Sequence, residues 1–135
     1  MTLFLDTSAM LAAVVDSGDR QLLLDAVARH AGDVYASALA LTEALAAIDR
    51  LTEGVVLRAD LEDAIRHLWD HLHVVPVDQR CLDDAARLAR ERPIRLTDAI
   101  HLAAALRLPP SIEFATVDPA QLPVAIGLGC TVISS

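Results

Sequence analysis

Four acidic residues stand alone in the most apolar windows of the sequence. Each is the only charged side chain, histidine aside, of its window: Asp6 in residues 1–15, Glu43 in 34–48, Asp98 in 96–106 and Asp118 in 114–135. Carboxylates are rarely buried without a partner because their desolvation is costly, and the windows give none of the four an Arg on its own helix turn or strand. Held together, they would repel one another. A divalent cation resolves that conflict, because Mg²⁺ and Mn²⁺ prefer carboxylate and water oxygens.

The chemistry that such a cluster supports is metal-assisted hydrolysis of a phosphodiester. A bound cation lowers the pKa of a water molecule and stabilises the attacking and leaving oxygens of an in-line displacement. This reaction needs no nucleophilic side chain, which suits a chain without a Ser/His/Asp or Cys/His arrangement. We expect the hydroxyls of Thr7 and Ser8 either to contact a metal-bound water or a phosphate oxygen, or to cap a helix.

A structural interpretation of each acid stands beside the catalytic one. Asp6 and Asp98 are placed where they would cap helices, since free N–H groups and the helix dipole favour carboxylates there. Asp118 would cap a turn with Pro119. Glu43 lies inside a predicted helix and has no capping role. The occurrence of all four acids together favours the metal site.

The elements that must position these acids alternate between short apolar runs and amphipathic segments. The predicted strands are residues 2–5, 34–36, 73–77, 112–117 and 131–134. The predicted helices are residues 7–15 capped by Thr7 or Ser8, 20–31, 37–52 capped by Ser37, 58–72, 78–92 capped by Asp78, 97–108 capped by Thr97, and a short helix or turn at 121–128. Strands separated by helices predict a three-layer α/β/α sandwich with a mostly parallel central sheet and a cleft at the carboxyl ends of its strands. We expect all four acids near that edge, with Glu43 on a helix face that packs on the sheet.

The composition bounds the class of protein. At 135 residues we expect one domain, residues 1–135, and a hydrophobic content of 54% excludes disorder. The formal net charge is −8 and all eleven bases are Arg, which argues against a general polyanion binder and excludes a P-loop or a Schiff-base Lys. The first residues lack a basic leader, and no apolar stretch has membrane length. We therefore expect a cytoplasmic protein whose two cysteines, Cys81 and Cys130, are free thiols.

The segments around the four acids share their sequences with a known family. LFLDTSAMLA, LTEALAA, LTDAIHLAAAL and ATVDPAQL follow one another through nearly the whole chain. In this order they resemble the PIN-domain ribonucleases, most closely the VapC-type toxins of type II toxin–antitoxin pairs. The combination of D-T-S after an N-terminal strand with D-A-I-H-L-A is fairly specific.

The resemblance implies a Mg²⁺- or Mn²⁺-dependent endoribonuclease. It also implies a homodimer that a cognate antitoxin inhibits in a heterotetramer or larger complex, with a basic antitoxin segment lying across the active site. Asp6 and Asp98 match the family's principal metal-ligating aspartates, and Glu43 matches its helix glutamate. Asp118 matches its fourth acid, in the Thr116-Val117-Asp118 context, although Pro119 departs from the family's pattern.

Two further groups bear on this function. Four arginines, Arg87, Arg90, Arg92 and Arg95, precede the predicted helix that carries Asp98. We interpret them as a basic patch that guides RNA phosphates to the cleft, or equally well as ordinary exposed helix charges. His101 lies one turn after Asp98 and either contacts the metal site or packs beside the core.

Two other functions remain open from the sequence. A phosphatase of the aspartyl-phosphate kind also places an Asp after its first strand, but it needs an acid where Ser8 stands and a Lys, which the chain lacks. The main alternative is an interaction module with the same fold and little or no catalysis. Binding of Mg²⁺ or Mn²⁺ distinguishes that module from the nuclease.

Overall fold

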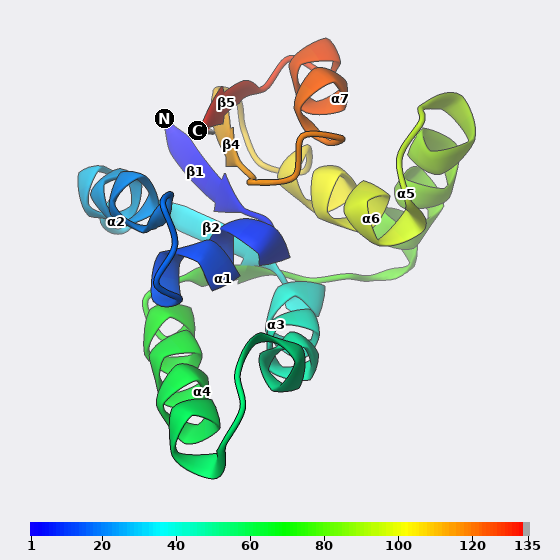
Figure 1. Cartoon of the computed structure of the whole chain (residues 1–135). Helices are drawn as coiled ribbons and strands as arrows, with labels where there is room; N and C mark the ends of the chain where they lie inside the picture. Colours follow the sequence, from blue (N-terminus) through cyan, green and yellow to red (C-terminus); the bar gives the residue numbers. More distant parts are fainter. Residues whose placement is uncertain (134–135) are drawn as a thin grey trace.

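The computed structural model describes residues 1–133, in which five strands form one parallel sheet (Figure 1). The strands are β1 (Thr2–Leu5), β2 (Val34–Ser37), β3 (His73–Val75), β4 (Ile112–Ala115) and β5 (Thr131–Ile133). Their order is β3-β2-β1-β4-β5, and each of the four pairings is parallel. Because β1 is central, its carboxyl end lies between those of β2 and β4. The predicted end of the last strand, Ser134, lies outside the described residues.

In the described part of the chain, seven helices cover the two faces of this sheet. They are α1 (Thr7–Val14), α2 (Arg20–Arg29), α3 (Ala38–Leu51), α4 (Val55–Trp69), α5 (Gln79–Glu91), α6 (Leu96–Ala105) and α7 (Leu122–Gly127). The buried residues of α1 to α4 form one hydrophobic core, and those of α5 to α7 form a second core. The predicted three-layer α/β/α sandwich is therefore confirmed.

The residues of β1 show how one strand supplies both cores. Successive side chains of a strand point to opposite faces of the sheet. Leu3 and Leu5 accordingly belong to the core under α1 to α4, whereas Phe4 belongs to the other core. There Phe4 stacks on Phe114 of β4, with ring centroids 5.7 Å apart. Every side chain of the apolar run is thus buried, which fits a strand between two helical layers.

Several predicted boundaries are wrong by a few residues, each for a local reason. Helix α4 begins at Val55, three residues before the predicted start. The first turn was not predicted because its apolar side chains are exposed and do not follow the amphipathic pattern of the rest of the helix. Strand β3 ends at Val75, because the next residue is Pro76, which has no N–H for the ladder. Strand β4 ends at Ala115, since the N–H of Val117 turns to the Ser8 hydroxyl.

Two further expectations concern the cysteines and membrane-spanning helices. Cys81 and Cys130 are free, as predicted, and both are buried. Within residues 1–133, no helix combines the length and the apolar character that crossing a membrane would require.

Candidate active site

The four isolated acids line one cavity of about 420 Å³ at the carboxyl edge of the sheet. Asp6 follows β1 directly, and Asp118 lies three residues after β4. Glu43 comes from α3 and Asp98 from the first turn of α6. The fold thus brings together residues that are up to 112 positions apart in the chain. Their chemical role stays a prediction at this point, but their convergence is a feature of the fold.

Asp6 combines the two roles that the sequence left as alternatives. Its Oδ1 caps α1 by accepting from the N–H of Ala9 at 2.8 Å, and it also accepts from the Ser8 hydroxyl at 2.7 Å. The predicted cap, Thr7 or Ser8, is therefore wrong. The side chain is only 1% exposed. Burial raises the pKa of Asp6, and hydrogen bonds from Thr116, Ala9 and Ser8 oppose that rise.

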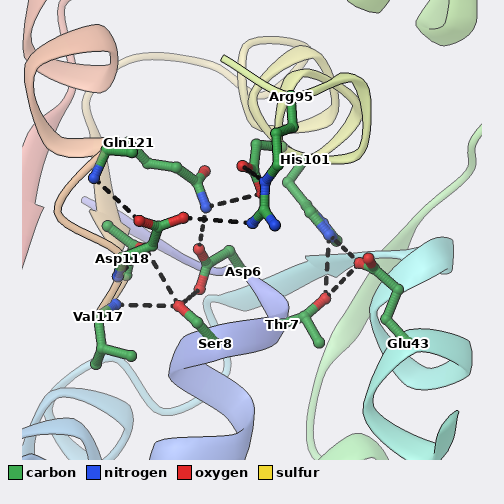
Figure 2. A network of polar contacts seen from close by, with 12 residues as sticks. Asp6, Thr7, Ser8, Glu43, Arg95, His101, Val117, Asp118 and Gln121 are labelled. Carbon is green, nitrogen blue, oxygen red and sulfur yellow. Dashed lines mark hydrogen bonds and ion pairs between the residues drawn. The ribbon is translucent and has the colours of Figure 1, made fainter. Parts of the chain in front are cut away.

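A glutamine that the sequence reasoning missed joins the two central aspartates. Gln121 Nε2 donates to Asp6 Oδ2 at 2.7 Å and to Asp98 Oδ1 at 3.2 Å. Figure 2 shows its side chain reaching over Asp6. Gln121 is the only side-chain amide in the apolar stretch after Asp118, which is the signal that would have singled it out.

Asp98 does not cap its helix, because α6 begins at Leu96 with Arg95 as the N-cap residue. Arg95 also corrects the expectation that no Arg shares a helix turn with any of the four acids. Its Nε lies 3.0 Å from Asp98 Oδ2, and one of its terminal nitrogens lies 3.5 Å from Asp118 Oδ2. The Arg95 side chain is 76% exposed, so water weakens both ion pairs. The window that isolated Asp98 began one residue after this Arg.

The other predicted arginines do not share this cavity. Arg87 pairs with Asp84 and lines a separate cavity of about 400 Å³ with Arg80 and Arg107. Arg50 of α3, which the sequence reasoning did not single out, is the second guanidinium at the four acids. Of the predicted patch, Arg87 and Arg95 thus line two different cavities, whereas Arg90 and Arg92 line neither of them, and the role of the patch toward RNA stays a prediction.

Glu43 belongs to a partly buried hydrogen-bond network with His101. The Nε2 of His101 contacts Glu43 Oε1 and lies 3.0 Å from the Thr7 hydroxyl, which itself donates to Glu43 at 2.7 Å. Ser37 Oγ lies 2.9 Å from Nδ1 of the same ring. An ionised carboxylate only accepts, so Nε2 carries the proton toward Glu43. The hydrogen bond from His101, followed by that from Thr7, lowers the pKa of Glu43 and keeps it ionised.

This network corrects one expectation about Glu43. The side chain was expected on the helix face that packs on the sheet, but it is half-buried and lines the cavity. The face of α3 that enters the core carries Ala40, Ala44 and Ile48 instead. The prediction that His101 packs beside the core agrees with its buried ring, which also contacts Glu43; its contact with a metal site stays a prediction.

The segment after β4 is held to α1 through hydroxyl groups. Ser8 Oγ accepts from the N–H of Val117 at 3.1 Å, and Thr116 Oγ1 accepts from the N–H of Asp118 at 3.0 Å. Figure 2 shows this chain of contacts beside Asp6. The Thr-Val-Asp sequence therefore fixes the backbone of Asp118, whose Oδ1 accepts from Ala120 in a tight turn.

The charge balance of the cavity suits a divalent cation. Four carboxylates face two guanidiniums, those of Arg50 and Arg95, and burial raises the pKa of Asp6, the most buried of the four. The donors are oxygens, as Mg²⁺ and Mn²⁺ prefer. In the conformation of residues 1–133, however, no three His, Cys, Asp or Glu side chains approach one another closely enough to hold a metal ion. Gln121 and Arg95 lie between the acids instead.

The sequence of this chain matches the model of a known protein family. A family model described as PIN domain matches residues 3–121, whereas no curated protein matches the chain.

Several solved structures have a similar fold. They include VapBC2 from Rickettsia felis bound to a DNA fragment from its promoter (12% identity, TM-score 0.74, covering 100% of this chain and 99% of that chain). They also include PAE2754 from Pyrobaculum aerophilum (22%, 0.74, 99% and 89%). A third is VapBC-5 from Mycobacterium tuberculosis, a member of the VapBC family of toxin–antitoxin systems (21%, 0.65, 100% and 100%).

Proposed function

The chain belongs to the PIN domain family, and from its site we propose that it is an endoribonuclease that hydrolyses RNA phosphodiester bonds with Mg²⁺ or Mn²⁺. We further propose that it acts as the toxin of a toxin–antitoxin pair and that a cognate antitoxin neutralises it. The observation that carries the nuclease proposal is the cavity at the carboxyl edge of the sheet. There Asp6, Glu43, Asp98 and Asp118 gather with fewer guanidiniums than carboxylates.

The acids of this cavity provide the oxygen ligands that metal-assisted hydrolysis requires. Asp6 and Asp98 are the proposed principal ligands, since both are buried and their oxygens face a common point, now filled by the Gln121 amide. Glu43 and Asp118 complete the proposed set. A bound cation would supply an activated water and stabilise the developing charge on the phosphodiester oxygens.

Other side chains of the site orient these acids or the substrate. Ser8 holds one oxygen of Asp6, which leaves the other directed into the cavity. Thr7 and His101 fix Glu43 in its ionised form. Arg50 and Arg95 line the same cavity with positive charge, and we propose that they bind the phosphates on either side of the scissile bond.

Cation dependence and substrate class are tested together. The purified protein is incubated with a structured RNA and with DNA of the same sequence, in Mn²⁺, in Mg²⁺ and in EDTA. We expect cleavage of the RNA alone, loss of cleavage in EDTA and recovery after excess Mn²⁺ is added. Full cleavage in EDTA would contradict the proposal. Binding of RNA with no cleavage under any condition would favour the interaction module.

The toxin proposal extends the family resemblance to a partner. VapBC-5, one of the similar structures, belongs by its description to a toxin–antitoxin family. By analogy, we propose a cytoplasmic homodimer that binds an antitoxin, whose inserted segment contributes a basic side chain to the four acids. The acidic excess of the cavity supports such a segment, because a guanidinium would neutralise the same oxygens as the cation does.

The partner is tested in cells. Expression of the chain is expected to arrest growth, and co-expression of a small protein from the adjacent upstream reading frame is expected to relieve the arrest. The Asp98→Asn variant should not arrest growth, although it should still co-purify with that protein. Arrest that persists in Asp98→Asn would contradict a toxin that acts through this site.

A further inference from the structure

Among the described residues, 1–133, one oxygen at the four acids has no hydrogen-bond partner, and it belongs to Gln121. Gln121 is 98% buried, and its Oε1 is a buried side-chain atom without a hydrogen-bond partner among residues 1–133. Buried polar atoms in native proteins are nearly always hydrogen-bonded, because an unsatisfied acceptor is unfavourable. An oxygen left unpaired beside a cluster of carboxylates therefore calls for a ligand.

The other atom of the same amide explains why this oxygen is left over. Nε2 lies 2.7 Å from Asp6 Oδ2 and 3.2 Å from Asp98 Oδ1. Carboxylate oxygens only accept hydrogen bonds, so the NH₂ group must face them and Oε1 must face away. The NH₂ group of Gln121 thus occupies the position between Asp6 and Asp98 that a cation would occupy.

A cation and this NH₂ group exclude one another, because both need the same oxygens of Asp6 and Asp98. The terminal torsion of a Gln side chain is broad and roughly twofold. A half turn about it exchanges Nε2 and Oε1 while the carbon atoms stay nearly in place. The turn brings an amide oxygen, a donor that hard cations bind, to the position of the nitrogen.

We propose that Gln121 is an oxygen ligand of the cation held by Asp6 and Asp98, and that its amide turns over when the cation binds. This inference rests on the proposed cation dependence of the nuclease. It adds a neutral donor to the four acids and gives the unpaired oxygen a partner. The backbone favours this role, since the N–H of Gln121 donates to the carbonyl of Asp118 at 3.1 Å and fixes both residues in one turn.

The side-chain amide signals of the protein report this movement directly. The chain contains three Gln residues and no Asn, so a ¹⁵N-labelled sample gives three side-chain NH₂ pairs. Gln21 and Gln79 donate to Asp25 and Asp83 on exposed helix surfaces and serve as internal controls. Upon titration with Mg²⁺ we expect the Gln121 pair to shift saturably while the other two stay in place. A Gln121 pair that does not move while calorimetry records Mg²⁺ binding would overturn the inference.

Two substitutions measure the contribution of the oxygen. Gln121→Met keeps the length of the side chain but removes the amide, and we expect it to weaken Mn²⁺ binding by about tenfold or more in calorimetry. Gln121→Glu keeps an oxygen at the same position and should bind Mn²⁺ at least as tightly as the unmodified chain. Gln79→Met, on the exposed surface of α5, should change nothing. Unchanged or tighter binding by Gln121→Met would overturn the inference.

The outcomes separate this inference from the proposed function. If the unmodified chain binds neither Mg²⁺ nor Mn²⁺, the cation-dependent nuclease fails, and the role of Gln121 fails with it. If the unmodified chain binds the cation, but the Gln121 signal and the Gln121→Met affinity are unchanged, only the role of Gln121 fails. Should Gln121→Met not fold, the titration of the unmodified chain still decides.

Discussion

Asp6 uses its two oxygens for different contacts, and this division lets a buried carboxylate that caps a helix also serve as the metal ligand proposed above. One oxygen closes the first turn of α1 through Ala9 and Ser8, whereas the other meets the amide of Gln121. Burial still raises the pKa of Asp6 despite these contacts. A positive charge beside Asp6 Oδ2 would therefore stabilise the ionised carboxylate, but among the described residues the side chain at that oxygen is the neutral amide of Gln121.

Arg95 is predicted to compete with the cation. It contacts one oxygen of Asp98 and lies 3.5 Å from Asp118, so Arg95→Gln removes a positive charge from two proposed ligands. We expect Mn²⁺ to bind this variant severalfold more tightly in calorimetry, while the affinity for RNA decreases. Arg90→Gln, which removes an exposed charge from α5, is the control. Weaker Mn²⁺ binding by Arg95→Gln would show that the guanidinium supports the cation site instead.

The elements of this fold could largely be predicted from local sequence, whereas the contacts between them could not. Asp78 caps α5 as predicted, since an Asp before an amphipathic segment has one dominant use. Ser37 occupies the predicted position before α3 but makes no capping bond, because its hydroxyl lies at His101, 64 residues away. No local pattern contains that partner. The link between Gln121 and Asp6 was missed for the same reason.

The cap of α5 gives a prediction about pH. The hydrogen bond from the N–H of Cys81, with the nearby Arg107, lowers the pKa of Asp78 from its ordinary value of 3.8. A carboxyl group whose pKa is lower in the folded state stabilises the protein above pH 3.8 and loses that effect as the pH falls through the lowered value. Asp78→Ala should therefore melt at a lower temperature at pH 7, and the difference should shrink below pH 3.8. A difference that is independent of pH would mean that the carboxylate charge does not contribute.

The packing of α4 gives a prediction about stability. Ile65 is fully buried in the core under α1 to α4, whereas Leu57 of the same helix is 57% exposed. Ile65→Ala should lower the free energy of unfolding by about 2 to 5 kcal/mol in urea denaturation, through lost burial and the remaining cavity. Leu57→Ala should change it by less than about 0.5 kcal/mol. Equal effects of the two substitutions would contradict the described position of α4.

At the scale of the whole molecule, the distribution of charge matters more than its total. The net charge of −8 argues against general binding of nucleic acid, yet the fold concentrates four of the nineteen acids at one sheet edge, where a cation would neutralise them. The architecture and the convergence of these acids could be predicted from the sequence. The apolar windows indicate the buried elements of the sheet and its helices, and the single acid in each window indicates a residue that these elements bring to one site. The placement of Arg87 and Arg95 at two different cavities could not be predicted, since it depends on how α5 and α6 pack.

This distribution predicts a shallow salt dependence of RNA binding. If Arg50 and Arg95 each neutralise one phosphate, the slope of log K against log salt concentration should be about −1.4 for single-stranded RNA, from about −0.7 per phosphate. The slope is measured with a non-cleaved RNA in EDTA. A slope steeper than about −4 would mean that the molecule uses a much larger basic surface than these two arginines, and the Arg80, Arg87 and Arg107 cavity would be the next surface to test.

The central claim, that the cavity of the four acids is the catalytic centre, is tested most directly by the rate of RNA cleavage of matched Asp→Asn variants in Mn²⁺. Asp6→Asn and Asp98→Asn change one oxygen each in the cavity, whereas Asp63→Asn makes the same change on the exposed surface of α4. We expect the first two to cleave more than about 100-fold more slowly, since loss of even an outer contact of a metal site costs about 10- to 100-fold. Asp63→Asn should retain the full rate. Cleavage by folded Asp98→Asn at the rate of Asp63→Asn would contradict the claim.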